Sequence, residues 1–223
     1  MKVLRICVGT PVDIEYQGKV VQTSIFKTRV EGSILVRSLN IDGDRQSDLT
    51  DHGGCNKAIY VYSDDDYDYW NRKLGVRLDQ DSQFGENLTV SGGRDEQVLI
   101  GSRYRLGDTE VTVTQPRIPC FKLGIRWNDK TFPRRFWTAG RLGFYLRVEK
   151  EGLIKRNQSL TLVSTPEHGF TVRKLYEVVK NRETESAERA LNTLPHLDDG
   201  WIGRLRKITD QESRARNQPG PRL

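Results

Sequence analysis

Cysteine and long apolar runs are the two features that this chain has little of. Its 223 residues include three cysteines, Cys7, Cys55 and Cys120, whose irregular spacing forms neither a disulfide framework nor a paired zinc motif. The apolar runs are only a few residues long and mean hydropathy is −0.65, which excludes a bilayer-spanning segment. The N-terminal apolar patch meets Asp13 and Glu15 before an export signal develops. We therefore expect a cytoplasmic protein with no membrane association.

The positive charge is concentrated at the C-terminal end. The formal net charge is +6, and residues 201–223 hold six cations against two acids, so the rest of the chain is nearly neutral. A basic end of this kind can bind nucleic acid or an acidic protein, but it is more often a solvated end. We do not expect specific binding to nucleic acid.

Short strands dominate the pattern from residue 20 to residue 164, where runs of apolar and β-branched residues alternate with Gly- and Asp-containing turns. Two helices are expected to interrupt them, one from Asp64 to Leu74 with Ser63 as N-cap and Gly75 as its stop, and one over residues 133–138. Many short strands predict a mainly β fold with a closed or nearly closed barrel, which we assign to residues 1–165. The expected strands are 20–27, 33–41, 58–62, 87–90, 103–106, 110–115, 144–149 and 160–164.

The periodicity becomes helical after Pro166. Apolar residues follow Thr171 at helical spacing, and further helices are expected over residues 185–194 and 200–208. This pattern predicts a small three-helix domain over residues 166–211. Residues 212–223 contain too few apolar groups to form a core, so we expect a disordered tail there.

The segment from Gln115 to Leu123, QPRIPCFKL, places a thiol directly after a strand. Two prolines prevent the preceding strand from continuing, and Arg117 and Lys122 flank Cys120. Nearby cations lower the pKa of a thiol and favour the thiolate, which is the form that attacks or binds metal. The local sequence is also compatible with a buried, inert cysteine.

Two further segments and one lysine carry groups suited to chemistry. His52, within Asp51-His52-Gly53-Gly54, could donate a proton near neutral pH, although a loop histidine is usually only a surface residue. In Phe84-Gly85-Glu86-Asn87-Leu88 a carboxylate and a carboxamide precede a strand, but turns favour Gly and Asn for conformational reasons alone. Lys27 is a polar residue at the end of a β-like run. None of these residues indicates a site by itself.

In combination, these segments resemble one family. SIFKTRV, Gly43-Asp44 with Gln46, DHGG, FGENL and QPRIPCFKL occur here in the order and spacing typical of MOSC domains, the family named after the C-terminal domain of molybdenum-cofactor sulfurase. The likeness is to the free-standing bacterial YiiM-type proteins and covers most of the chain. It implies a β-barrel with an open groove for molybdopterin, and the family also has a general association with pyridoxal phosphate. One departure is Cys55, which follows the DHGG glycines where relatives tend to carry proline.

The resemblance also implies roles for individual residues. Cys120 would bind molybdenum, and Lys27 and His52 would polarise the substrate and deliver protons. The expected cofactor-binding residues are Arg117, Lys122, Gly85, Glu86 and Asn87.

The activity that the resemblance implies is reduction of N-hydroxylated compounds such as hydroxylamino base analogues. The chain has no flavin or iron–sulfur motif, so electrons would come from a separate donor protein, for which the basic C-terminal end is a docking candidate. Three other functions stay open at this point. They are a cofactor or sulfur carrier that uses Cys120, a hydrolase that pairs Cys120 with His52, and a nucleic-acid binder.

Overall fold

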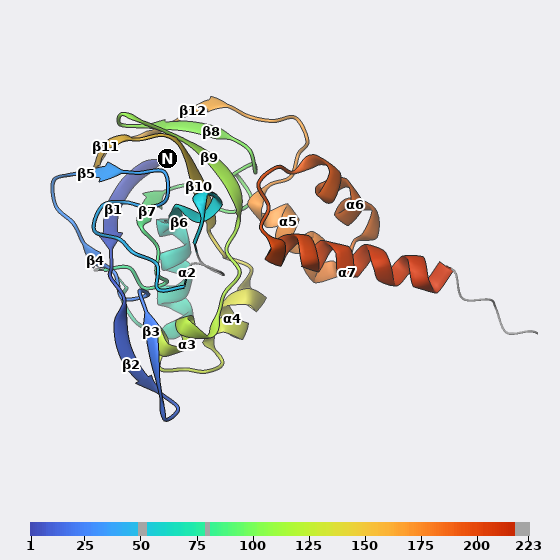
Figure 1. Ribbon diagram of the computed structural model, residues 1–223, viewed down its shortest axis with the longest axis horizontal. Coiled ribbons are helices and arrows are strands. Elements are labelled where there is room, and N and C mark those ends of the chain that lie inside the picture. The colour runs from blue at the N-terminus through green and yellow to red at the C-terminus, as the bar shows by residue number, and fades with distance from the viewer. Residues whose placement is uncertain (49–52, 79–80, 217–223) are drawn as a thin grey trace, which may run out of the picture.

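The computed structural model describes residues 1–48, 53–78 and 81–216, and its largest element is a mixed sheet of eight strands (Figure 1). The strand order is β12-β8-β9-β10-β6-β7-β1-β4, and β6 and β7 form the parallel pair of an otherwise antiparallel sheet. The strands are β1 (Lys2–Val8), β4 (Thr28–Arg29), β6 (Ile59–Ser63), β7 (Leu88–Ser91), β8 (Arg103–Leu106), β9 (Thr109–Pro116), β10 (Phe144–Lys150) and β12 (Leu160–Ser164).

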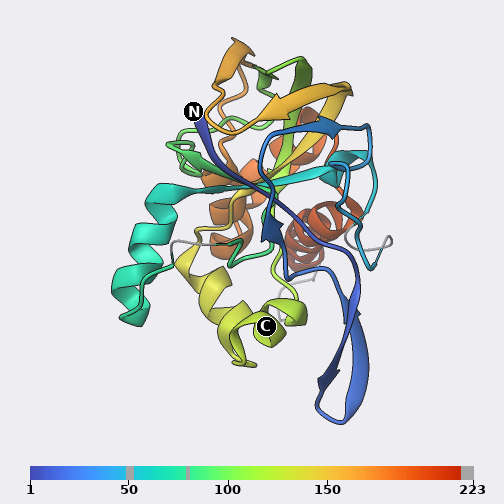
Figure 2. The same ribbon diagram turned by 90° about the vertical axis from the view of Figure 1, so that its left-hand side faces the viewer.

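Two hairpins accompany the sheet. β2 (Val12–Tyr16) pairs with β3 (Lys19–Thr23), and β5 (Ser33–Val36) pairs with β11 (Gly152–Lys155). Figure 2 shows the β2–β3 hairpin extending away from the body of the molecule. The sequence prediction missed β1, β2, β4 and β11, and the strands it did predict overlap those observed.

The fold is sheet-rich as expected, but it is mixed, with six α-helices among the described residues, and a closed barrel is not found there. The strand ladder runs from β12 to β4 and is open. Its ends approach each other at the start of β1, where Lys2 forms an isolated bridge with Ser159 and the Val3 amide donates to Gln158 O over 2.9 Å. A turn with Asn157 at φ +70° occupies this position, so the pairing goes no further.

The bounds predicted for helix α2 (Asp64–Leu74) are confirmed. Ser63 occupies the N-cap position, and Gly75 ends the helix at φ 67°. Tyr67 and Trp70 are buried, whereas Leu74 is only partly buried. Helix α4 (Phe132–Ala139), predicted over 133–138, packs Phe136 with its ring plane 6° from that of Trp70.

An unpredicted helix, α3 (Phe121–Trp127), begins directly after Cys120. Its seven residues are too few for helical periodicity to be recognised in the sequence. The strand, proline turn and helix together place the cysteine at the N-cap position, with φ −119° and ψ 173°.

Three helices follow the sheet, at the predicted positions: α5 (Val172–Asn181), α6 (Thr184–Thr193) and α7 (Asp199–Arg216). Thr171 caps α5 by accepting from Lys174 N over 3.0 Å. Buried Trp201 of α7 donates to Pro116 O over 2.8 Å, and these helices share the buried apolar cluster of the sheet. Whether residues 166–211 form a separate domain stays a prediction.

The C-terminal end differs from the expectation in part. α7 continues through Arg216, so the first five residues of the predicted disordered tail are helical, and residues 217–223 lie outside the described part of the chain. Within the described residues, no helix is long and apolar enough to cross a membrane.

Candidate functional site

Cys120 lies on the wall shared by two cavities. β9 ends at Pro116, and the prolines lead the chain away from the sheet to the first turn of α3. The cysteine is partly exposed and forms no disulfide. It lines both cavities, together with Lys57 and Tyr145. The alternative of a buried cysteine is therefore wrong, and the reactivity of Cys120 stays a prediction.

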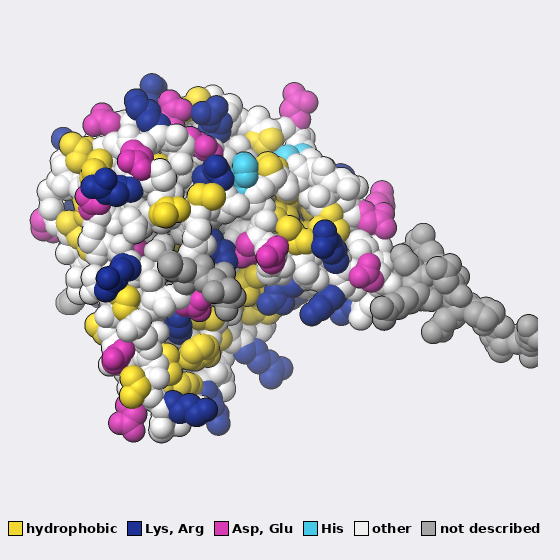
Figure 3. Space-filling view, in the orientation of Figure 1, with side chains coloured by type: hydrophobic (Ala, Val, Ile, Leu, Met, Phe, Trp, Pro, Cys, Tyr) yellow, Lys and Arg dark blue, Asp and Glu magenta, His cyan; other side chains and the backbone are white. Residues whose placement is uncertain are grey.

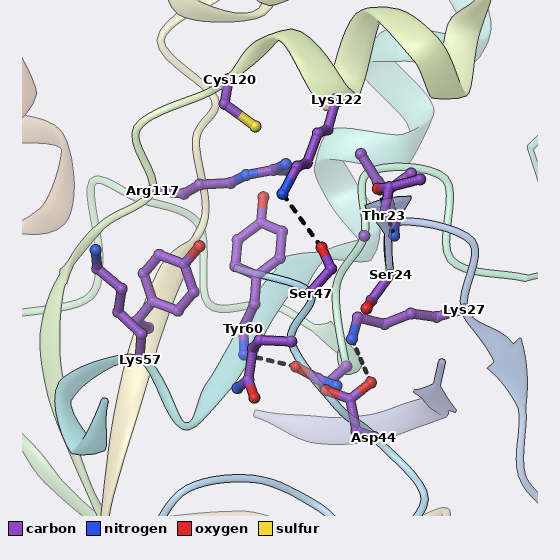
Figure 4. A pocket seen from close by; sticks show the side chains of 15 residues that line it. Thr23, Ser24, Lys27, Asp44, Ser47, Lys57, Tyr60, Arg117, Cys120 and Lys122 are labelled. Atoms are coloured by element: carbon purple, nitrogen blue, oxygen red, sulfur yellow. Dashed lines mark hydrogen bonds and ion pairs between the residues drawn. The ribbon is translucent and has the colours of Figure 1, made fainter. Parts of the chain in front are cut away.

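The first of these, which we call the cationic cavity, encloses about 80 Å³ and is shown in Figure 4. Cys120, Arg117 and Lys122 lie at one end of it, and Lys27 and Asp44 lie at the other. Four cationic side chains therefore face one carboxylate among the described lining residues. The full lining is Thr23, Ser24, Ile25, Lys27, Asp44, Gln46, Ser47, Lys57, Tyr60, Gly85, Asn87, Arg117, Cys120, Lys122 and Tyr145.

Arg117 supplies a buried positive charge next to the thiol. Its side chain donates to Phe84 O and lies 4.8 Å from the centre of the Tyr60 ring, and the residue is 5% exposed. Burial acts to lower the pKa of the guanidinium, but Tyr60, Tyr145 and Cys120 raise it, and the result lies above the ordinary value. Burial in turn raises the pKa of Tyr145 to about 12. The guanidinium therefore stays charged beside Cys120.

Each lysine of the cationic cavity is held by an acidic or hydroxyl partner. Buried Lys27 is ion-paired with Asp44, whose carboxylate also accepts from Gly9 N over 2.8 Å. Lys122 Nζ donates to Ser47 Oγ over 3.2 Å and lies 3.6 Å from an oxygen of Asp48. These contacts hold the ammonium groups in the cavity wall.

Gly85 and Asn87 of the predicted FGENL turn line the cavity, whereas Glu86 does not. Gly85 has φ +81°, and a Cβ there would lie 3.0 Å from Ile25 Cγ1. The Asn87 carboxamide accepts from Tyr60 N and donates to Cys7 O, which joins β6 to β1. Glu86 is fully buried, and its carboxylate accepts hydrogen bonds from Tyr67, Ser82, Thr89 and the Phe84 amide.

The structure thus brings together six of the predicted site residues around the cationic cavity: Lys27, Gly85, Asn87, Arg117, Cys120 and Lys122. Glu86 does not line the cavity, because its carboxylate supports the turn from within the core. The predicted direct contact between Glu86 and the cofactor is therefore wrong. His52 lies outside the described residues. Sequence reasoning missed Lys57, Tyr60 and Tyr145, since no local motif distinguishes one strand tyrosine or loop lysine from another.

The second cavity, which we call the helix-side cavity, lies between the sheet and the start of α7 and encloses about 510 Å³. The turn before α7 contributes Asp198, and α7 itself contributes Asp199, Gly200 and Arg204. The remaining lining residues are Gly53, Gly54, Cys55, Asn56, Lys57, Gln115, Ile118, Pro119, Cys120 and Tyr145. A cavity of this size is within the range of small-molecule sites.

Sequence comparison identifies relatives over nearly the whole chain. The protein YflK of Bacillus subtilis is 36% identical over 213 residues, which cover 94% of this chain and 95% of YflK. Protein YiiM of Escherichia coli is 31% identical over 162 residues, covering 69% of this chain and 72% of YiiM. A Gibberella moniliformis protein named Reductase is 30% identical over 168 residues, or 74% of this chain but only 30% of that protein.

The fold agrees with solved structures of the same group. The crystal structure of YiiM from Geobacillus stearothermophilus superimposes with a TM-score of 0.77 at 27% identity, covering 93% of this chain and 98% of that one. The model of the MOSC domain family matches residues 48–161. The chain therefore belongs to the MOSC domain family and is a protein of the YiiM type.

Proposed function

We propose that this protein is a molybdenum-cofactor-dependent oxidoreductase that reduces N-hydroxylated compounds such as hydroxylamino base analogues. MOSC domains are associated with binding of the molybdenum cofactor, and the fungal relative named Reductase supports an oxidoreductase-like activity. The observation that carries the proposal is the position of Cys120, a partly exposed thiol on the wall between two cavities, next to the buried guanidinium of Arg117.

The described residues suit such a cofactor. The Cys120 side chain offers a soft sulfur ligand of the kind that cofactor-bound molybdenum would accept, and the buried positive charge of Arg117 lies beside it. The cationic cavity has the charge needed by an anionic group such as the cofactor phosphate. Cys120 would hold the metal, while Arg117 and Lys122 would hold the anionic part.

The proposed reaction breaks an N–O bond. An N-hydroxyl group takes up two electrons and two protons, and the products are the N–H compound and water. The bound cofactor would supply a metal that changes its oxidation state by two electrons. The chain's own contribution is to supply hydrogen-bond donors to the departing oxygen. Lys57 lines both cavities and suits this role, alongside the predicted Lys27 and His52.

Electrons would come from a separate protein that carries a flavin or an iron–sulfur cluster. The exposed side chains of Arg204, Arg206 and Lys207 lie near the start of α7, close to the helix-side cavity, and Figure 3 shows Lys and Arg side chains gathered beside the C-terminal helices. A basic surface of this kind suits an acidic donor. Reversing the charges of Arg206 and Lys207 should slow donor-coupled turnover and leave turnover with a small viologen donor unchanged. Equal rates with the natural donor would contradict this docking site.

The first test is molybdenum content, measured by elemental analysis on protein from a host that makes the cofactor. We expect stoichiometric molybdenum in the wild type and loss of it in Cys120→Ser, with Cys55→Ser as the matched cysteine control. The loaded wild type should convert a hydroxylamino base to the amine with reduced viologen. Bound molybdenum without turnover would indicate a carrier protein instead. Absence of molybdenum from the wild type would contradict the proposal.

A further inference from the structure

The two cavities that meet at Cys120 differ in charge and size. Among the described residues, the smaller cationic cavity has four cations and one carboxylate. In the larger helix-side cavity, Lys57 and Arg204 are matched by Asp198 and Asp199. An anionic group is therefore favoured in the first cavity, and an uncharged polar ligand is favoured in the second.

We infer that the helix-side cavity binds the uncharged base of the substrate, and that Arg204 of α7 determines its specificity. This inference rests on the proposed function and places the substrate of that reaction in the helix-side cavity. Ile118, Pro119 and Tyr145 provide apolar contacts for a planar ring, and Asn56 and Gln115 add polar groups at the wall. Cys120 belongs to the wall of the same cavity, so a base bound there lies beside the residue proposed to hold the metal.

The wall formed by α7 is held in place by Asp198. One carboxylate oxygen accepts from Trp201 N over 2.9 Å, which caps α7, and the other lies 2.5 Å from Lys57 Nζ. The backbone amide of Asp198 donates to Gln115 Oε1 over 2.7 Å. The contacts with Lys57 and Gln115 join the start of the helix to the turn before β6 and to β9. The cavity is therefore organised before a ligand arrives, which reduces the ordering cost of binding.

Arg204 supplies directional hydrogen-bond donors on this wall. Its guanidinium lies 5.3 Å from the centre of the Trp137 ring, and this contact restricts the orientation of the side chain. An arginine N–H group can donate to a ring-nitrogen acceptor of a purine, such as N7. At Gly200, four residues earlier, a Cβ would lie 3.2 Å from Ile118 Cδ1, so glycine keeps this part of the cavity open.

The inference is tested by binding to the full chain, without an electron donor, so that no turnover occurs. The probes are 6-hydroxylaminopurine and inorganic phosphate, each followed by isothermal titration calorimetry. Arg204→Gln should weaken binding of 6-hydroxylaminopurine about fivefold to tenfold and leave phosphate binding unchanged. Lys122→Gln should weaken phosphate binding and leave binding of 6-hydroxylaminopurine unchanged. Arg134→Gln, an exposed arginine of α4 that lines neither cavity, should change neither affinity.

Three results would overturn the inference. They are unchanged base affinity in Arg204→Gln, loss of base binding in Lys122→Gln, and direct competition between the base and phosphate.

Failure of the proposed function gives a different pattern. In that case the protein lacks molybdenum or shows no turnover, yet Arg204→Gln still weakens only base binding and Lys122→Gln still weakens only phosphate binding. The helix-side cavity is then a base-binding site in a protein with another activity. If turnover occurs and Arg204→Gln leaves the substrate KM unchanged, only the inference is wrong.

Discussion

The ammonium group of Lys57 lies 2.5 Å from the carboxylate of Asp198, and this ion pair links the sheet to the start of α7. Both side chains are largely shielded from solvent, with 11% and 21% exposure. The pair lies on the cavity wall, so it connects the position of the C-terminal helices to the surroundings of Cys120. This ion pair and three other structural relationships lead to measurable expectations.

Asp198→Asn removes the charge that faces Lys57 but keeps an oxygen able to cap α7. We expect the free energy of unfolding to fall by about 1–2 kcal/mol, between the values typical of exposed and buried ion pairs. Urea denaturation measures this change. Asp199→Asn, at the exposed neighbouring position, is the matched control and should have a smaller effect. Equal losses in the two variants would show that the ion pair does not stabilise the fold.

Ionisation of Asp95 should lower the free energy of unfolding as the pH rises from about 4 to 7. Burial, together with the nearby Asp66, raises the pKa of this carboxyl from 3.8 to about 7, although Arg173 and hydrogen bonds from Leu142 N and Gly143 N act in the opposite direction. The folded protein therefore retains a proton that the unfolded chain releases near pH 4. This contribution to stability is fully present below pH 4 and is lost as the pH approaches 7.

The measurement is urea denaturation of the wild type and Asp95→Asn across pH 4.5 to 7.5. We expect the difference in unfolding free energy between the two proteins to change by up to about 1.4 kcal/mol per pH unit, since the variant has no carboxyl to ionise. A difference that is constant with pH would contradict the raised pKa of Asp95.

Gly85→Ala should destabilise the turn that lines the cationic cavity by about 1–3 kcal/mol. The φ of +81° strains any side chain, and the new Cβ would lie 3.0 Å from Ile25 Cγ1. Gly32→Ala separates these two causes, because Gly32 has φ +82° and a Cβ at that position would meet no described atom within 4 Å. Urea denaturation should give a larger loss for Gly85→Ala. Equal losses would assign the whole effect to backbone strain.

Mild peroxide should join Cys55 to Cys120. Both thiols line the helix-side cavity, and Arg147 donates to Cys55 Sγ over 3.2 Å. Oxidation of one thiolate to a sulfenic acid, followed by condensation with the other thiol, would form a disulfide and release water. Buried Cys7, whose pKa burial raises to about 11, should stay reduced. Peptide mass spectrometry that finds Cys55 and Cys120 free after treatment would contradict this expectation.

The local sequence was sufficient for features that depend on neighbouring residues. The end of α2 follows from Gly75, because left-handed termination is a local effect. Ser63 directly precedes the helix as predicted, but its hydroxyl donates to Gly92 O and does not cap the helix. Alternating β-branched residues identified most strands, and the two prolines placed Cys120 beyond the end of β9. The motifs also identified the MOSC family and six of the residues that line the cationic cavity.

Only the tertiary structure decided which distant residues meet. Lys57 and Asp198 lie far apart in the sequence, and no local pattern indicates that they form an ion pair. Glu86 is adjacent to two cavity residues in sequence, yet its carboxylate turns into the core because four donors satisfy it there. The sheet likewise stays open because the chain before β12 meets β1 through one isolated bridge, between Ser159 and Lys2. Hydrogen-bond satisfaction and packing across the whole fold determine these contacts, and short-range propensity does not report them.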